Sequence, residues 1–492
     1  MLEKIRGIFQ NRRLVMIIGG VMIVVIILVV VMLLTGKKTD TGGNFVAAEP
    51  EYDTNITFQS LYQGDNTYKD LIAQFESLPQ NKNVKINLVV KNDGASQSYY
   101  NSLINAFALD AGPDIFSIRN DEKNSYLNFM SPLQNVRDET GQVVANSVLK
   151  ANYKQNFVDL VVKDTMYRDE IYGITSYVDN LQLYYNKELL NQAGFVRPPS
   201  TWNELEGQLS SLNKRDLGGI DFSRNAVSMG TGFTKSNATT FGDYGLNINR
   251  FQDVLAALVF QQGGQFYDSD TGEVMLGKKV DGDDPALNAI RFFESFGNIN
   301  SSRYSWNTNS PNNIDAFVQG KLAYIMHYKY LQDVIASRNP SLRYDVAPLP
   351  QLDTQNKKTY GTFYMNVMAK KNFDRCLANP LDGAGQRKCN KIKEFLYFLT
   401  TRPAQETFAL KTGLPSAHRD VIGLQQQGEA KLRNFANGAV FADNYYKPNI
   451  EKTESLLGNL FYRVQLENNT VERSYQQTVE DYNTLVQNSD GR

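Results

Sequence analysis

The sequence predicts an α/β protein of two lobes, preceded by one transmembrane helix. Past residue 53, short runs typical of strands alternate with amphipathic runs typical of helices, which is the pattern of sheets covered by helices. About 450 residues follow the apolar N-terminal run, more than one hydrophobic core normally holds, and 42% hydrophobic residues suffice for two ordinary domains. The N-terminal run itself is long enough to cross a bilayer.

The apolar run predicts a membrane anchor. Residues 14–34 contain no charge, and at about 1.5 Å per residue they match a hydrocarbon core of about 30 Å. A cleavable signal peptide is the alternative, but its apolar core spans about 7 to 15 residues and ends in small residues, unlike this run. Lys37 stands where a lipoprotein would require the lipid-carrying Cys, which excludes lipidation there.

Charges around the run predict its orientation. Lys4, Arg6, Arg12 and Arg13 precede it and only Lys37 and Lys38 follow closely, so the positive-inside bias places the N-terminus in the cytoplasm. We therefore expect a cytoplasmic tail at 1–13, a transmembrane signal anchor in the lipid bilayer at 14–35 and a flexible tether at 36–53. Beyond Lys38 the net charge is about −6, which argues against a nucleic-acid partner.

The remaining elements follow from periodicity. Alternating or β-branched runs predict strands, and helix-forming runs between them predict the helices of a parallel α/β arrangement. Strands are expected at 56–62, 84–90, 114–118, 171–177 and 181–185, and helices at 68–78, 100–109, 187–193, 253–260, 285–296 and 459–486. Residues 223–249 have too little pattern for an assignment.

Residues 172–204 have the most informative order of elements. Gly194 stands where a left-handed helix cap is needed after the helix at 187–193, and the two prolines that follow prevent its continuation. Thr201 and Glu204 have the spacing of a capping box, which predicts that another helix starts there. Trp202, in the first turn of that helix, is expected to pack rather than to bind a ligand.

This order resembles the extracellular solute-binding proteins of ABC importers, in the large family whose members mostly bind sugars. The matching segments are Tyr172-Gly173-Ile174 with Thr175 in place of the usual Pro, Tyr184 to Lys187, Pro199 to Glu204, Gly112 to Ile115, Ala316-Phe317 with Gly320 to Ile325, and Gly413 to Pro415. No single segment is specific, but their order is, and the resemblance covers roughly residues 54–485.

The resemblance implies a periplasmic-binding-protein-like (type II) fold with a hinge and an interlobe cleft. Lobe 1 is expected to contain 54–178 and 314–346, and lobe 2 to contain 179–313 and 347–487. The chain is then expected to cross between lobes near Val178 to Leu181, near Asn313 and near Val346 to Leu349. A solute would bind in the cleft, and the lobes would close on it by hinge motion.

Candidate ligand-binding residues combine rings, amides and charges. A sugar needs aromatic rings that stack on its apolar faces and polar groups that form paired hydrogen bonds with its hydroxyls. Loops at the carboxyl ends of strands and the expected crossings supply these groups. The candidates are Tyr62, Gln63, Arg119, Asn120, Tyr177, Asp179, Trp306, Tyr328, Tyr330, Phe363 and Tyr364. With 27 Tyr and 27 Phe in the chain, a core or surface role is the alternative for each ring, and helix capping is the alternative for Asp179.

Cys376 and Cys389 are the only cysteines. Both fall in the exported region and flank a Pro- and Gly-containing loop, so a disulfide worth about 3 kcal/mol is the favoured interpretation. Two buried free thiols are the alternative.

Other motifs are weaker, and no cofactor is expected. The segment 272–279 mimics a phosphate-binding loop, but Lys279 replaces the required Ser or Thr. The acidic residues at 268–284 fail the EF-hand spacing, which leaves a structural calcium open. Only two histidines are present, which excludes a His-rich metal site.

The expected function is that of a membrane-anchored, monomeric solute-binding protein, not an enzyme. It would capture a solute, a carbohydrate first of all, and deliver it to the permease subunits of an ABC transporter. A peptide or another polar solute is an alternative ligand, and an anchored cell-envelope hydrolase or a ligand sensor is an alternative of a different class.

Overall fold

A computed structural model describes residues 52–61, 65–91, 96–133, 136–137, 143–145, 147–212, 215–216, 219–220, 225–228, 251–269, 271–305, 312–372 and 383–490. The described residues all fall within one compact unit, 52–492. The predicted anchor at 14–35 lies outside the described residues and stays a prediction. Within the described part of the chain, the helices are all too short or too polar to span a bilayer.

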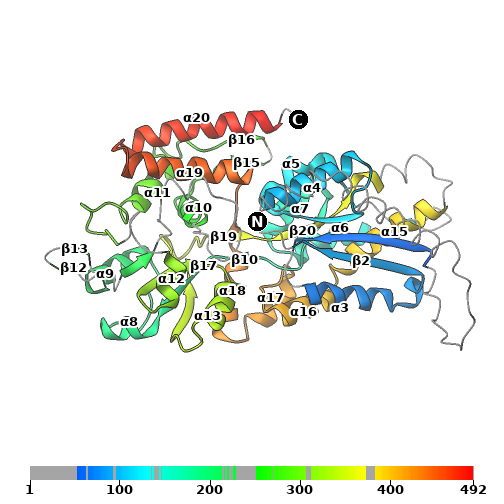
Figure 1. Cartoon of the computed structure of the whole chain (residues 1–492), viewed down its shortest axis with the longest axis horizontal. Coiled ribbons are helices and arrows are strands. Elements are labelled where there is room, and N and C mark those ends of the chain that lie inside the picture. The colour runs from blue at the N-terminus through cyan, green and yellow to red at the C-terminus, as the bar shows by residue number, and fades with distance from the viewer. Residues whose placement is uncertain are drawn as a thin grey trace, which may run out of the picture. The chain divides into compact units, whose positions relative to one another are not determined.

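The first sheet forms the centre of lobe 1 (Figure 1). Its strand order is β2-β1-β3-β20-β4, and β9 also pairs with β20. The strands are β1 (Thr54–Ser60), β2 (Val84–Val90), β3 (Ile115–Arg119), β4 (Met130–Ser131), β9 (Gly173–Ile174) and β20 (Tyr364–Ala369). Strand β1 runs parallel to β2 and β3, whereas β20 runs antiparallel to β3.

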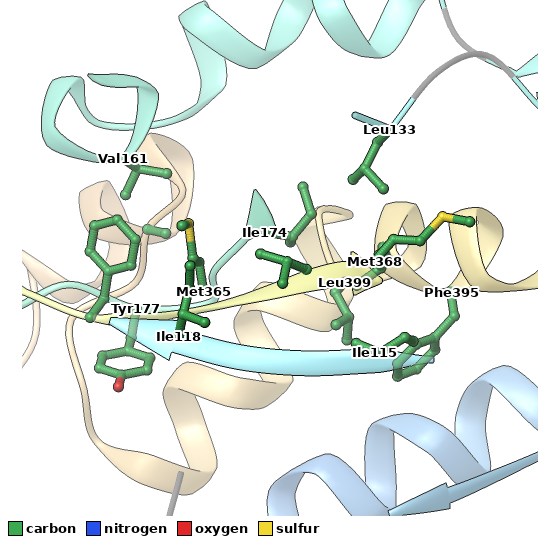
Figure 2. Packing of buried hydrophobic residues seen from close by; sticks show 14 of the residues in the cluster. Ile115, Ile118, Leu133, Val161, Ile174, Tyr177, Met365, Met368, Phe395 and Leu399 are labelled. Atoms are coloured by element: carbon green, nitrogen blue, oxygen red, sulfur yellow. The ribbon is translucent and has the colours of Figure 1, made fainter. Parts of the chain in front are cut away.

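Helices from both ends of the chain belong to lobe 1. They are α3 (Asp65–Glu76), α4 (Ser96–Ala108), α5 (Lys123–Tyr126), α6 (Ser147–Asn156), α7 (Asp159–Thr165), α15 (Gly383–Phe398), α16 (Arg402–Thr412) and α17 (Arg419–Gln425). Figure 2 shows Ile115 and Ile118 of β3 beside Met365 and Met368 of β20, with Phe395 of α15 close by. All five residues of β3 are buried because the strand is central in the sheet.

The second sheet forms the centre of lobe 2, with the order β14-β17-β11-β18. Its strands are β11 (Gln182–Asn186), β14 (Asn225–Ser228), β17 (Leu322–His327) and β18 (Tyr344–Pro348). The helices of this lobe are α8 (Lys187–Gln192), α9 (Trp202–Leu212), α10 (Phe251–Gln261), α11 (Pro285–Glu294), α12 (Asn313–Val318), α13 (Leu331–Arg338), α19 (Ile450–Gln465) and α20 (Val471–Asp490). Helices α19 and α20 pack side by side (Figure 1).

Short elements complete the two lobes. The two-stranded hairpins in the described part of the chain are β5–β6 (Val136–Arg137, Val143–Ala145), β7–β8 (Met166–Tyr167, Glu170–Ile171), β12–β13 (Arg215–Asp216, Gly219–Ile220) and β15–β16 (Tyr267–Asp268, Glu273–Val274). The 3₁₀ turns among the residues that the structure covers are η1 (Pro79–Asn81), η2 (Asn120–Glu122) and η3 (Leu127–Phe129).

A third sheet joins the lobes, and we call it the hinge sheet. It consists of β10 (Asp179–Asn180), β19 (Thr359–Thr362) and β21 (Ala442–Asp443), with β19 in the middle. Hydrophobic side chains change from the lobe 1 core to the lobe 2 core, or back, across each of these strands. Within the described residues the chain therefore crosses between lobes three times, and the middle crossing strand pairs with each of the other two.

Two glycines allow the hinge sheet to pack closely. A Cβ on Gly361, in β19, would lie 2.7 Å from the Cβ of Ala442 and 2.7 Å from a methyl group of Leu160. A Cβ on Gly438, in α18 (Ala430–Val440), would lie 2.1 Å from the Asn180 side-chain oxygen. Side chains at these two positions would push the crossing strands away from their neighbours.

The observed crossings correct two of the three predicted ones. The crossing near Val178 to Leu181 is where the sequence places it. The other two lie at Tyr360–Phe363 and Ala442–Tyr445, and neither Asn313 nor Val346–Leu349 is a crossing. Residues 314–346 belong to lobe 2, because β17 pairs with β11, and most of 363–442 belongs to lobe 1, because β20 pairs with β3.

The helix ends predicted around residues 187–204 agree with the structure, but the predicted capping box is only half formed. Helix α8 ends before Gly194, whose φ of 84° is left-handed, as a helix cap of this kind requires. The Glu204 N–H donates to the Thr201 hydroxyl at 3.2 Å, but the Glu204 carboxylate accepts from the Ser200 N–H at 2.7 Å instead of from Thr201. Trp202 is 1% exposed and packs, as expected. The predicted helix at 459–486 is two helices, α19 and α20.

Candidate functional site

The corner that follows β3 places three polar residues beside the hinge sheet. The Arg119 guanidinium donates to both carboxylate oxygens of Asp121, at 3.0 and 2.6 Å. The Asn120 side-chain oxygen accepts the Phe363 N–H at 3.1 Å, directly after the middle hinge strand. Arg119 and Asn120 are both buried. The Asn120 bond ties this corner of lobe 1 to the crossing at Tyr360–Phe363.

Asp164 of α7 ties this corner to the third crossing. Its Oδ2 accepts the Asn120 amide at 2.7 Å and the Asn444 amide at 2.6 Å. Burial raises the pKa of Asp164, because its charged form is removed from water. A single carboxylate therefore links the β3 corner to the segment that follows β21.

Asp179 links the first crossing to lobe 2. Its Oδ1 accepts the N–H of Asn180 at 2.9 Å and the N–H of Lys329 at 3.2 Å. The Lys329 ammonium donates to the Thr412 carbonyl of lobe 1 at 3.0 Å. The region between β17 and α13 is thereby attached both to a crossing and to the opposite lobe.

Aromatic candidates lie on both sides of the hinge sheet. Tyr177 stacks on Phe408 with ring centres 5.7 Å apart, and its hydroxyl accepts the Tyr364 N–H at 3.2 Å. The Tyr330 hydroxyl lies 3.1 Å from Nε2 of His327. Tyr328 is buried, and its hydroxyl donates to Asp253 at 2.8 Å.

The structure divides the predicted site residues into two groups. Arg119, Asn120, Tyr177, Asp179, Tyr328 and Phe363 are buried. Tyr330 and Tyr364 are half-buried, one in lobe 2 and one in lobe 1. Tyr364 directly follows the crossing at Tyr360–Phe363, whereas Tyr330 is distant from the crossings in sequence and follows Lys329, whose N–H binds Asp179 of the first crossing. Tyr62, Gln63 and Trp306 lie outside the described residues. Among the described candidates, Tyr330 and Tyr364 are therefore the two whose rings are partly exposed.

A buried cluster around Lys447 is the part of this region that the sequence analysis missed. The Lys447 ammonium lies 3.6 Å from Asp121, 3.3 Å from Asp253 and 3.2 Å from Glu454, and its side chain is 0% exposed. We call these four residues the Lys447 cluster. The one signal in the sequence is that Lys447 directly follows two tyrosines, in the stretch 444–448. This signal is weak, because a lysine is normally expected at the surface.

The charges of this cluster shift the ionisation of its members. Burial opposes the charged form of Asp121, but Arg119 and Lys447 outweigh it and lower the Asp121 pKa to about 2. Burial also opposes the charge of Lys447, but the acidic groups around it raise its pKa well above the usual value. Burial and the Asp121 charge raise the pKa of neighbouring Glu122 to about 8. Asp121 and Lys447 are therefore charged at neutral pH, whereas Glu122 is protonated.

Other predicted groups lie away from this region or outside the description. Cys389 is disulfide-bonded, and Cys376, the only other cysteine of the chain, lies outside the described residues. No group of three or more potential metal ligands occurs among the residues that the structure covers. The fold is that of two lobes joined by a short three-stranded sheet.

The chain belongs to the bacterial extracellular solute-binding protein family, because the family model matches residues 60–406. Proteins of Brucella abortus and Brucella suis, provisionally described as binding proteins, are 24% identical over 212 residues. These matches cover 42% of this chain and 45% of the relatives, so the chain aligns with less than half the length of these curated relatives.

Solved structures with a similar fold cover most of the chain. An ABC substrate-binding protein from Listeria monocytogenes, in complex with cycloalternan, is 15% identical with a TM-score of 0.61, over 88% of this chain and 98% of that one. A cyclic α-maltosyl-1,6-maltose binding protein from Arthrobacter globiformis is 13% identical with a TM-score of 0.65, over 88% and 99%. A sugar-binding protein from Xanthomonas citri is 17% identical with a TM-score of 0.64, over 88% and 98%. At these identities the similarity shows the two-lobed fold.

Proposed function

We propose that this chain is a membrane-anchored binding protein that captures a carbohydrate between its lobes and delivers it to the permease of an ABC transporter. The observation that carries the proposal is the hinge sheet, in which three crossings are paired in a protein of the solute-binding family. Several proteins of the same fold were solved with, or are named for, carbohydrate ligands, which supports a carbohydrate as the solute. Membrane anchoring rests on residues 14–35 of the sequence.

The rings of Tyr330 and Tyr364 are the proposed sugar platforms. Each is half-buried, and they come from opposite lobes, so closure would bring a ring from each side to the solute. Aromatic rings stack on the apolar faces of sugars and bury large areas at low conformational cost. A positioning role falls to Arg119, Asn120, Asp179 and Tyr177, because their described hydrogen bonds are made to other groups of the protein. They would hold the crossings and the flanking loops in place.

The test is thermal unfolding of the full-length protein in detergent with mono- and oligosaccharides, amino acids and peptides. A ligand that binds only the folded state, present at about 100 times its dissociation constant, adds about 2.7 kcal/mol of stability. We expect a selective shift with a saccharide, and its loss in Tyr364→Ala and in Tyr330→Ala. Tyr185→Ala is the matched control, because Tyr185 is also half-buried but pairs with Tyr324 and Asp345 inside the lobe 2 sheet.

The other outcomes are equally informative. A shift with peptides alone would replace the carbohydrate by a peptide. Chemical conversion of a ligand would make the protein an anchored hydrolase. No shift across the panel, or an equal loss of shift in Tyr185→Ala, would remove the support for the proposed solute and its platforms.

A further inference from the structure

Lys447 lies at the place where the two lobes and the third crossing meet. It follows β21 and precedes α19, so it is part of the chain that returns from lobe 1 to lobe 2. Asp121, one of its three carboxylate partners, belongs to the β3 corner of lobe 1. The other two, Asp253 and Glu454, are on α10 and α19 of lobe 2. The ammonium is therefore shared between lobes.

Further contacts fix the geometry of this cluster. The Lys447 N–H donates to the Asp121 carbonyl at 2.7 Å, so backbone and side chain both reach lobe 1. The rings of Tyr360 and Tyr445 lie 5.3 and 5.2 Å from the ammonium. Tyr360, on the middle hinge strand, also donates its hydroxyl to the Asp121 carboxylate at 3.2 Å. The cluster thus joins both lobes and two of the three crossings.

Separation of these charges would be costly. Asp121, Asp253 and Glu454 are at most 3% exposed, and Lys447 with Arg119 supplies the two nearby positive charges that the structure describes. A buried charge that loses its partner stays removed from water, and the penalty exceeds the value of the pair itself. A lobe movement that pulled Asp121 away from Lys447 would therefore be disfavoured. Movements that keep this contact closed remain accessible.

We propose that Lys447 is the pivot of the lobe movement, and that its ion pair with Asp121 stays closed while the lobes rotate and sets their resting angle. Lys447 is then a positioning residue, which acts on solute binding through the angle of the lobes and not by contact with the solute. The inference rests on the proposed function only where solute affinity is concerned. The resting angle can be measured without any solute.

The experiment measures a distance between the lobes in the full-length protein in detergent. Two spin labels are introduced as noncanonical amino acids, so that the cysteines stay untouched. One replaces Leu109, which is 80% exposed in lobe 1, and the other replaces Val196, which is 98% exposed in lobe 2. Pulsed electron paramagnetic resonance then gives the distance distribution without solute. The variants are Asp121→Asn, which removes the pair between lobes, and Glu454→Gln, which removes an equally buried pair within lobe 2.

We expect Asp121→Asn to broaden and shift the distribution and Glu454→Gln to leave it as in the unmutated protein. If the fraction of molecules whose lobe angle allows solute binding falls by about tenfold, the apparent solute affinity also falls by about tenfold. Asp121→Glu keeps the charge but moves it by one methylene, so it should shift the main distance even if Asp121→Asn does not fold. Unchanged distances in the Asp121 variants, or the same change in Glu454→Gln, would overturn the proposal.

Failure of the proposed function gives a different result. In that case no solute stabilises even the unmutated protein, whereas the label distances still respond to the Asp121 variants. The two proposals are therefore tested separately.

Discussion

In the described chain, two ion-pair centres connect the lobes. Their central residues, Asp443 and Lys447, are four residues apart, in and directly after the third crossing. The Lys447 cluster is buried, with Lys447 0% exposed. In the second centre, which we call the Asp443 bridge, Asp443 contacts Lys163 of α7 at 2.6 Å and Lys358 beside β19 at 3.3 Å. Its side chains are open to water, with exposures of 26%, 38% and 42% for Asp443, Lys163 and Lys358.

The difference shows that similar distances carry different energies. Water and salt screen the Asp443 bridge, and exposed pairs of this kind contribute about 0 to 1 kcal/mol. In the Lys447 cluster the charges have no water to replace a lost partner, so removal of one partner costs about 3 to 5 kcal/mol. One centre is therefore a strong constraint on the lobes and the other a weak one. Three substitutions test this contrast.

Lys447→Met should have the largest effect. It leaves three buried carboxylates without the ammonium, and we expect the free energy of unfolding to fall by about 3 to 5 kcal/mol. Urea denaturation of the full-length protein in detergent measures this loss. A loss below about 1 kcal/mol would mean that the buried cluster behaves like an exposed pair, and the contrast would fail.

Glu122→Gln should have an intermediate effect that depends on pH. Glu122 neighbours the Lys447 cluster, and its Oε2 has no hydrogen-bond partner within the described chain. Burial and Asp121 raise its pKa from 4.5 to about 8, so the folded state binds the proton more tightly than the unfolded state. Its contribution therefore makes stability fall as pH rises from about 4.5 to about 8, by at most about 1.4 kcal/mol per pH unit.

The measurement for Glu122 is the urea midpoint from pH 5 to about pH 9. The Gln variant should lack this part of the decline and should be the more stable protein at the alkaline end. Identical slopes for the variant and the unmutated protein would show that Glu122 ionises normally, and that the site is wetter than its burial indicates.

Lys163→Met should have the smallest effect. Lys163 is half-exposed and donates to Asp443 and to the Asn444 carbonyl. We expect a loss of about 1 kcal/mol or less, which should shrink further between low salt and about 1 M NaCl because the charges are screened. A loss as large as that of Lys447→Met, or one independent of salt, would contradict the distinction between the two centres.

The sequence predicted local elements better than the membership of the lobes. Strand β2 and the cap at Gly194 depend on neighbouring residues, and both were placed correctly. Strands β17 and β20 are both buried and apolar, so their patterns do not show that one joins lobe 2 and the other lobe 1. Their partners, β11 and β3, are distant in sequence, and periodicity contains no information on such pairing.

The site was predictable to a similar degree. Strand ends and the first crossing are visible in the sequence, and they led to the prediction of Arg119, Asn120, Tyr177 and Asp179 as ligand-binding residues. The structure gives these four residues internal partners, and a role in ligand binding stays a prediction. Lys447 was missed because a lysine in isolation is expected at the surface. Its burial depends on carboxylates from three separate parts of the chain, which only the folded structure brings together.

The order of the crossings also determines when each lobe can be completed during folding. All four strands of the lobe 2 sheet come from the continuous segment 182–348. The lobe 1 sheet joins β1, near the start of the exported region, to β20 at 364–369, and its core includes residues up to Ala442. Contacts between such distant segments form slowly, because a long loop must close first. We therefore expect lobe 2, which begins later in the chain, to acquire its sheet first, whereas β3 stays without its antiparallel partner until residues 364–369 are available.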